Sequence, residues 1–398
     1  MHHSMNGVRG WASLVVFVYH SVPLFYPVIS TQKHGVAKGY IDLFLAKSPL
    51  YVLTNGTFAV FVFFVLSGFV LSVKFFEEKS RIYVVSSMLR RYFRLAIPVF
   101  ASSLIIVICI RFNLFHENEM VKIGLLKTEQ QRYIFQFYFH DIFQESLIRV
   151  FTERSALLNL VLWTMQYELV GSYIVFLFII LFGTSRLRFA MYFIFLAFAG
   201  KTGYYVIYYK CFIFGVVLAD IYTNFPAIKR LNKIFSLEIM FIFTALSGLA
   251  LGSMPMYIEE PSAYQKSLQY VMRGVNFDGV YALGSCLVVL GVLFSKNLER
   301  IFSSKVSLFL GRVSFSIYLL HISIIFTFGY YLFSILEANK VLHDFAFVIY
   351  FVLTTFFAIT VSHYFEKFID RPINGFSQKV VWKVIDVAIS ARHATQSR

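Results

Sequence analysis

Long apolar stretches, each bounded by polar or charged residues, recur along the whole chain. An α-helix needs about 20 mainly apolar residues to cross the roughly 30 Å hydrocarbon layer of a bilayer, so this pattern predicts an all-α membrane protein. We place about ten transmembrane helices at 8–28, 55–74, 95–112, 157–182, 187–200, 203–221, 237–254, 277–295, 312–334 and 342–365. Gly200 and Gly203 leave open whether the stretch from 187 to 221 forms one kinked span or two.

The loops that carry most Lys and Arg give the orientation. These loops lie on the side of the two termini, and the long loop 113–156 on the other side balances its basic residues with Asp and Glu. The positive-inside rule therefore predicts that both termini are cytoplasmic. We predict one transmembrane domain over 1–372 with 113–156 as an extracytoplasmic loop on the membrane face, and a cytoplasmic tail at 373–398 with a short interfacial helix.

Composition agrees with a membrane protein. Hydrophobic residues make up 58% of the chain, charged residues 14%, and the mean hydropathy is +0.70, whereas soluble proteins carry about 25% charged residues. We attribute the net charge of +15 to basic cytoplasmic loops and expect no nucleic-acid partner. Cys109, Cys211 and Cys286 lie in apolar segments without metal-ligand spacing, so we expect neither a disulfide framework, a metal site nor a bound cofactor.

Several ionisable or polar residues fall inside the predicted spans, where such residues usually mark a functional site. Arg9 lies at the cytoplasmic entrance of the first span, and His20 lies about 16 Å deeper on nearly the same helix face. Glu168, Ser67 and His321 reach a similar depth in three other spans. Equal depth is a necessary condition for a shared polar cavity, although the sequence does not show that the four helices meet.

Each of these residues also has a structural interpretation. Arg9 could anchor its helix by reaching to the membrane surface, and His20 could hydrogen-bond to a neighbouring helix. Glu168 could tie its helix to an Arg or a Tyr, and Gly68 beside Ser67 favours close helix packing.

Two further groups of polar residues lie outside the spans. Arg90, Arg91 and Arg94 precede the third span, where they could either set the topology or clamp phosphate groups through their bidentate guanidinium groups. In the extracytoplasmic loop, His140 and Asp141 lie among aromatic residues. They form a candidate recognition surface for a sugar, with plain interfacial packing as the alternative.

Five motifs in this order resemble the acyltransferase-3 family of membrane acyltransferases, which includes the O-antigen and exopolysaccharide O-acetylases. The matching residues are Gly7-Val8-Arg9-Gly10 with His20, the segment 63–69, Arg90, Arg91 and Arg94, the segment 162–168, and Ser316, Tyr318, Leu319 and His321. Leu169 stands where relatives often have a second Glu, and the closing segment 366–372 is looser than the usual Glu-x-Pro. We expect neither departure to touch the catalytic centre, and we expect no appended esterase-like domain.

The resemblance implies transfer of an acyl group, most simply acetyl, from cytoplasmic acyl-CoA to a hydroxyl of an extracytoplasmic carbohydrate or glycolipid. The setting that it implies is polysaccharide biosynthesis at a bacterial inner membrane. His20 would act as general base or as a transient acyl carrier, and Glu168 would orient its imidazole. The arginines, Arg9 included, would bind the CoA phosphates. The acyl group would lie near Ser67, Tyr318 and His321, with Ser67 or Tyr318 binding the oxyanion.

Two other function classes remain open from the residues alone. A proton-coupled secondary transporter would use the His and Glu residues at mid-membrane as a proton relay, but no duplicated halves are visible in the sequence. A non-catalytic assembly subunit would have no need of such a set of residues.

Overall fold

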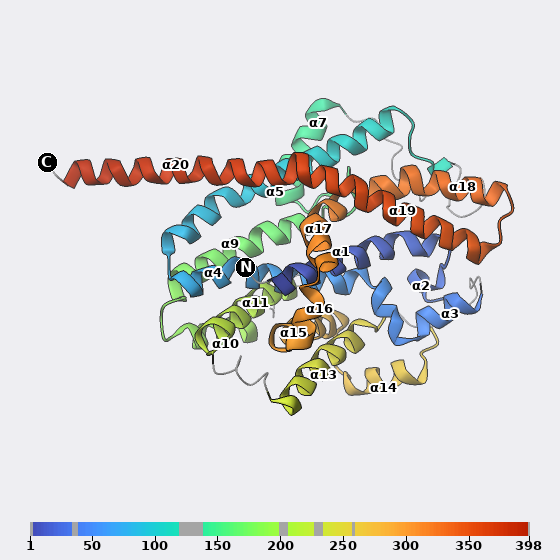
Figure 1. The fold of residues 1–398 in the computed structure, drawn as a ribbon, viewed down its shortest axis with the longest axis horizontal. Coiled ribbons are helices and arrows are strands. Elements are labelled where there is room, and N and C mark those ends of the chain that lie inside the picture. Colours follow the sequence, from blue (N-terminus) through green and yellow to red (C-terminus); the bar gives the residue numbers. More distant parts are fainter. Residues whose placement is uncertain are drawn as a thin grey trace.

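The computed structural model describes residues 3–33, 39–118, 138–198, 206–226, 234–256 and 259–396, and these ranges contain helices but no β-strand. Figure 1 shows one bundle of helices from which a single helix, α20, projects. Eight of the described helices or helix runs are long and apolar enough to cross a membrane. They are α4 (Gly56–Glu78), α5 (Arg81–Arg111), α9 (Thr164–Phe182), α11 (Val206–Asn224), α13 (Phe235–Gly252), α15 (Phe277–Phe294), and the runs Lys305–Ala338 and His343–Asp386. The predicted class of all-α, multi-pass membrane protein is confirmed.

Two of the predicted spans differ from this set. The first corresponds to α1 (His3–Ser21), which packs against α4 and α17 (Lys305–Ile324) in the middle of the bundle (Figure 1). Because other helices cover α1, its sequence need not be apolar all round. The predicted span at 187–200 corresponds to α10 (Arg188–Phe198), which is too short to belong to the eight.

The stretch from 187 to 221 forms two helices. Arg188 at the start of α10 lies 2.6 Å from Asp220 near the end of α11, so the two helices run antiparallel. Residues Gly200 to Gly203, where the sequence left the choice open, lie outside the described residues.

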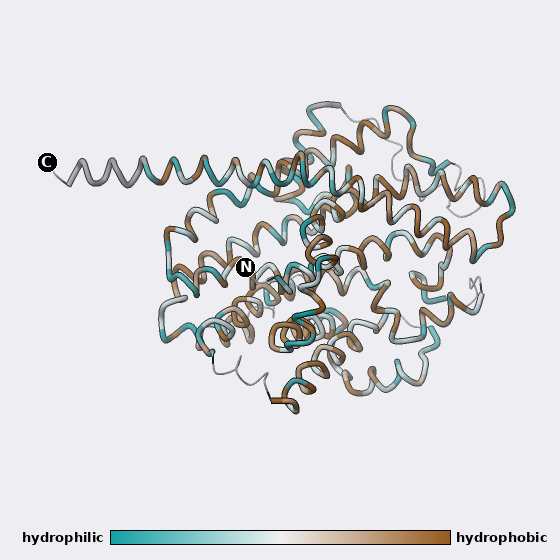
Figure 2. The backbone as a smooth tube through the Cα atoms, viewed as in Figure 1, coloured by the Kyte–Doolittle hydropathy of each residue, from teal (hydrophilic) through white to brown (hydrophobic). Residues whose placement is uncertain are grey.

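The predicted short interfacial helix in the tail is wrong in its extent. The last span, α19 (His343–Phe365), passes through a π-helical turn (Glu366–Asp370) directly into α20 (Arg371–Gln396). The tail is therefore a long continuation of that span. Figure 2 shows that hydrophilic and hydrophobic positions alternate along the described part of α20, whereas α13 is largely hydrophobic.

In loop 113–156, residues 139–152 are helical, and residues 119–137 lie outside the description. It contains α7 (Phe139–Gln144), a π-helical turn (Glu145–Arg149) and α8 (Val150–Thr152). The Tyr92 hydroxyl of α5 donates a 2.6 Å hydrogen bond to the Leu147 carbonyl, which holds this segment against the bundle. The side of the membrane on which it lies stays a prediction, as does the cytoplasmic location of the termini.

The remaining elements are short and connect or cover the spans. They are the 3-10 helices Val22–Leu24 and Pro49–Thr54, α2 (Val28–Thr31), α3 (Tyr40–Lys47), α14 (Ala263–Val271) and α16 (Lys296–Phe302). The π-helical turn Ile325–Gly329 and α18 (Tyr330–Ala338) continue α17 and belong to the span Lys305–Ala338.

Glycines allow the central helices to approach one another closely. A Cβ atom on Gly10 of α1 would lie 2.4 Å from the backbone nitrogen of Gly311 in α17. Between α4 and α11, a Cβ on Gly68 would lie 1.9 Å from the Phe212 carbonyl oxygen, and a Cβ on Gly215 would lie 2.2 Å from the Val65 carbonyl oxygen. Small residues are what permits such close backbone contact between membrane helices. The packing interpretation of Gly68 is thereby supported. The side chain of its neighbour Ser67 contacts Glu168 of α9 instead.

We expect Gly68→Ala to destabilise the bundle by about 1–3 kcal/mol, because the new methyl group forces the backbones of α4 and α11 apart. The measurement is the melting temperature of the detergent-solubilised protein. Gly375→Ala in α20 is the matched control, since a Cβ at that position meets nothing within 4 Å. An unchanged melting temperature for Gly68→Ala would contradict the close packing of α4 and α11.

Candidate active site

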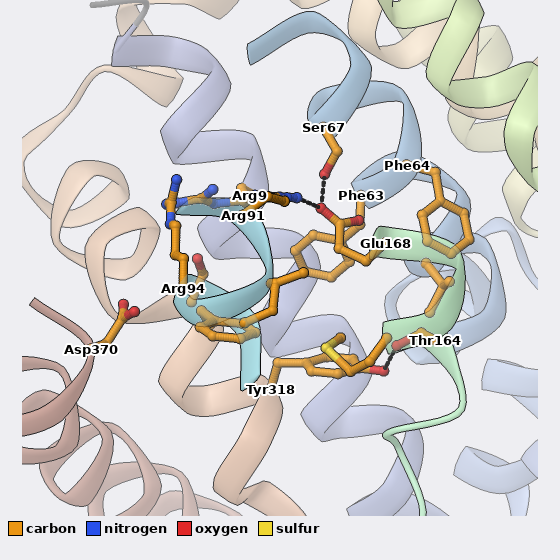
Figure 3. Close-up of a pocket in the computed structure, with 15 residues that line it drawn as sticks. Arg9, Phe63, Phe64, Ser67, Arg91, Arg94, Thr164, Glu168, Tyr318 and Asp370 are labelled. Carbon is orange, nitrogen blue, oxygen red and sulfur yellow. Dashed lines mark hydrogen bonds and ion pairs between the residues drawn. The ribbon is translucent and has the colours of Figure 1, made fainter. Parts of the chain in front are cut away.

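A pocket of about 740 Å³, its open mouth included, lies between α1, α4, α5, α9, α17 and the π-helical turn before α20 (Figure 3). Its polar lining consists of Arg9, Ser67, Arg91, Arg94, Thr164, Glu168, Ser314, Tyr318 and Asp370, and its apolar lining of Val60, Phe63, Phe64, Leu95, Met165 and Phe315. The pocket therefore joins an apolar wall to an unusual concentration of charge.

Glu168 is held by two partners from two other helices. Its Oε1 atom lies 2.5 Å from Arg91 Nη2 and accepts a 2.8 Å hydrogen bond from the Ser67 hydroxyl. Arg91 is itself buried and donates a second hydrogen bond of 2.8 Å from its Nε to the Ser172 hydroxyl. Pairing of this kind is what makes a carboxylate tolerable in a poorly solvated site. The prediction that Glu168 orients His20 is untested, and the tie to an Arg is the interaction that is observed.

The other two arginines of the pocket retain hydrogen-bonding capacity. Arg9 Nε is buried and has no hydrogen-bond partner among the described residues. Arg94 makes no hydrogen bond or ion pair within the described ranges, although Asp370 lies near enough to attract both arginines electrostatically. Figure 3 shows the three guanidinium groups gathered on one side of the pocket, with Asp370 beyond Arg94. These unused donors would suit an anionic ligand.

Of the three-arginine cluster of α5, two members reach the pocket and one does not. Arg91 and Arg94 line it, whereas Arg90 donates a 3.3 Å hydrogen bond to the Ser87 hydroxyl on its own helix. Around the axis of α5, Arg90 and Arg91 lie about 100° apart, and Arg94 lies between them. The pocket is on the Arg91 side, so Arg90 does not reach it.

Asp370 is a site residue that the sequence analysis missed. We expected the loose closing segment 366–372 not to touch the centre, and this expectation is wrong because Asp370 lines the pocket. The π-helical turn Glu366–Asp370 ends the last span beside α5 and α17. The available signal was an acidic residue at the end of an apolar span.

Tyr318 and Thr164 line the pocket and contact each other. The Tyr318 hydroxyl donates a 2.6 Å hydrogen bond to the Val161 carbonyl and lies 2.6 Å from the Thr164 hydroxyl. The Tyr318 proton is therefore engaged, as is the Ser67 proton, and an oxyanion-binding role for either hydroxyl would require an exchange of partner. That role stays a prediction.

His20 and His321 lie beside one another rather than in the pocket lining. Their ring centroids are 5.1 Å apart, and the His321 ring lies 6.0 Å from that of Tyr318, which does line the pocket. The four residues expected at equal depth thus form two separate contacts, Ser67 with Glu168 and His20 with His321.

The loop candidates His140 and Asp141 belong to α7 and are not part of the pocket lining. The Asp141 side chain accepts a 3.2 Å hydrogen bond from the Tyr138 backbone nitrogen, so it caps the start of α7. The His140 side chain is 81% exposed. A role of either residue in acceptor binding stays a prediction. The described residues contain no group of three or more His, Cys, Asp or Glu that could hold a metal ion.

The fold and the pocket together define a multi-pass membrane protein with a cationic site enclosed by its helices. The sequence profile of the acyltransferase-3 family, described as an acyltransferase domain, matches residues 2–366. The chain belongs to this family, and the protein is accordingly a membrane acyltransferase.

Curated relatives support this assignment. The chain is 24% identical to "Acyltransferase R4" of a Phoma species and 24% identical to "Acyltransferase clz18" of Cochliobolus lunatus. In both comparisons the match covers 93% of this chain and 93% of the relative. No solved structure matches the chain.

We expect removal of either partner of the Arg91–Glu168 pair to destabilise the protein by about 3–5 kcal/mol, because the remaining charge is left buried and unpaired. The double variant Arg91→Leu/Glu168→Leu should lose less than the sum of the two single variants. A double-mutant cycle from thermal unfolding in detergent measures the difference. Additive losses would show that the two charges do not interact.

Proposed function

We propose that this acyltransferase uses acyl-CoA, most simply acetyl-CoA, as its donor and a hydroxyl group of a carbohydrate as its acceptor. The observation that carries the proposal is the pair Arg9 and Arg94, which face the pocket with unused hydrogen-bond donors. CoA is rich in phosphate, and guanidinium groups bind phosphate through two parallel hydrogen bonds. Membership of the family supports acyl transfer itself and favours an enzyme over a transporter.

The three arginines of the pocket have two different roles in this proposal. Arg91 is occupied by Glu168 and Ser172, so it stabilises the wall of the pocket rather than binding phosphate. Arg9 and Arg94 then receive the anionic end of the donor, where Asp370 balances part of their charge until the phosphate arrives. An arginine adds binding energy for a phosphate only where its charge is not already paired within the protein.

The position of His20 fits the shape of the donor. His20 lies on the same helix as Arg9, about 16 Å further along its axis. In CoA, a long flexible arm separates the phosphates from the thioester, so phosphates bound near Arg9 would leave the thioester able to approach His20. The donor would then extend through the bundle along α1.

In the reaction that we propose, His20 acts as the general base. It takes the proton of the acceptor hydroxyl as the hydroxyl oxygen attacks the thioester carbonyl carbon. The carbon–sulfur bond of the tetrahedral intermediate then breaks, and the CoA thiolate that leaves takes the proton from His20. The alternative, in which the acyl group is first carried on His20 itself, needs the same residue but makes it the nucleophile.

The acceptor in this proposal is a carbohydrate. A carbohydrate would meet aromatic and polar side chains around α7, where His140 and Asp141 lie. The two named relatives come from fungi. The bacterial inner membrane and the polysaccharide pathway implied by the resemblance are therefore left as expectations.

We expect Arg94→Gln to raise the KM for acetyl-CoA about 10- to 100-fold, because it removes a charge-assisted contact to phosphate worth about 1.5–3 kcal/mol. The measurement is acetyl-CoA-dependent release of CoA by the purified protein. Arg90→Gln is the matched control, since Arg90 carries the same charge on the same helix but does not line the pocket. Equal effects of the two substitutions would indicate a general charge effect instead of a donor site.

We expect His20→Ala to abolish acyl transfer while the protein still inserts and folds, because the base is lost and the bundle contacts are kept. Transfer of labelled acetyl groups to membrane glycans measures activity, and size-exclusion chromatography in detergent measures folding. His3→Ala on the same helix serves as the control, since His3 is exposed at its start. Near-normal transfer by His20→Ala would refute the assignment of His20.

A further inference from the structure

Two histidines from different helices lie side by side near Tyr318. The rings of His20 in α1 and His321 in α17 are 5.1 Å apart between centroids, with their planes inclined by 38°. His20 is partly exposed, whereas His321 is completely buried. The proposed function uses His20 alone and leaves the buried histidine without an assigned step.

The hydrogen bond of His321 fixes its tautomer. Its Nδ1 atom lies 3.1 Å from the backbone carbonyl oxygen of Ile317, one turn earlier in α17. A carbonyl oxygen only accepts hydrogen bonds, so Nδ1 carries the hydrogen. In the neutral ring, Nε2 then bears a lone pair and is a hydrogen-bond acceptor.

That acceptor is unused. His321 Nε2 is buried and has no hydrogen-bond partner among the described residues. The neighbouring Tyr318 hydroxyl is committed to Val161 and Thr164, and the Ser323 hydroxyl donates to the Leu320 carbonyl. Buried polar atoms are rarely left without a partner, and those that are often have a role in function.

We propose that His321 is a positioning residue for His20, whose ring N–H it accepts through Nε2 in the reactive conformation of the site. This inference rests on the proposed role of His20 as general base. When the acceptor hydroxyl gives its proton to one nitrogen of His20, the hydrogen on the other nitrogen is donated to His321 Nε2. The proton returns from His20 to the CoA thiolate, so His321 gains and loses none.

The contact would act in two ways. Before the reaction it selects the His20 tautomer whose lone pair faces the acceptor hydroxyl, and during the reaction it stabilises the positive charge on His20. We assigned this orienting role to Glu168 from the sequence, but Glu168 already accepts hydrogen bonds from Arg91 and Ser67. A neutral ring does the same work without placing another charge in a poorly solvated region.

Two substitutions separate this role from a structural one. In His321→Asn, the side-chain amide nitrogen replaces Nδ1 and keeps the bond to Ile317, but nothing replaces the Nε2 acceptor. In His321→Gln, the longer side chain can place its carbonyl oxygen where Nε2 lies. We expect His321→Asn to lower the kcat of CoA release from acetyl-CoA about 10- to 100-fold with an unchanged KM, and His321→Gln to retain most of the kcat. A purely structural role predicts the opposite order.

A second measurement does not depend on turnover. Diethyl pyrocarbonate acylates the free nitrogen of a neutral imidazole, and mass spectrometry of the purified protein gives the rate at His20. Because a hydrogen bond accepted by His321 makes His20 more nucleophilic, we expect His321→Asn to slow this reaction several-fold and His321→Gln to slow it less. Wild-type rates of both kcat and His20 modification in His321→Asn would overturn the inference.

The same experiments distinguish this inference from the function on which it rests. If His20→Ala remains active, the proposed function fails whatever the His321 variants do. If His20→Ala is inactive while His321→Asn behaves as the wild type, only the positioning role fails.

Discussion

The buried ion pair between Arg91 and Glu168 is the constraint on which the rest of the site depends. It joins α5 to α9, and the Ser67 hydroxyl adds α4 to the same carboxylate oxygen. Leaving either charge alone among apolar helices would cost about 3–5 kcal/mol, so the register of these three helices cannot slide freely. The pocket therefore has a fixed wall before any substrate enters.

This pairing also decides which arginines are left for a ligand. Because Arg91 is hydrogen-bonded to Glu168 and Ser172, the unused donors of the pocket belong to Arg9 and Arg94. Asp370 partly neutralises the charge of these two arginines. The close contact of α1 with α17 through Gly10 and Gly311 brings Arg9 into the pocket lining. In the proposed function, donor binding therefore depends on the same helix packing.

The residues to which we assign donor binding and catalysis are laid out along α1. Arg9 near its start lies in the cationic pocket, while His20 near its end lies beside His321. A donor with its phosphates at one end and its thioester at the other suits this separation. The helix need not face lipid, and its polar residues are accordingly tolerated at the centre of the bundle.

The sequence by itself determined the class of fold, the approximate position of most spans and the identity of most candidate site residues, because hydropathy and motif spacing are local properties. Arg9, Ser67, Arg91, Arg94, Glu168 and Tyr318 were all identified in this way, and all of them line one pocket. Partners between helices depend on rotation and register, which local patterns do not contain. Only the tertiary structure decided that Glu168 pairs with Arg91, that Arg90 is left out, that Asp370 joins through a π-helical turn, and that His321 lies against His20.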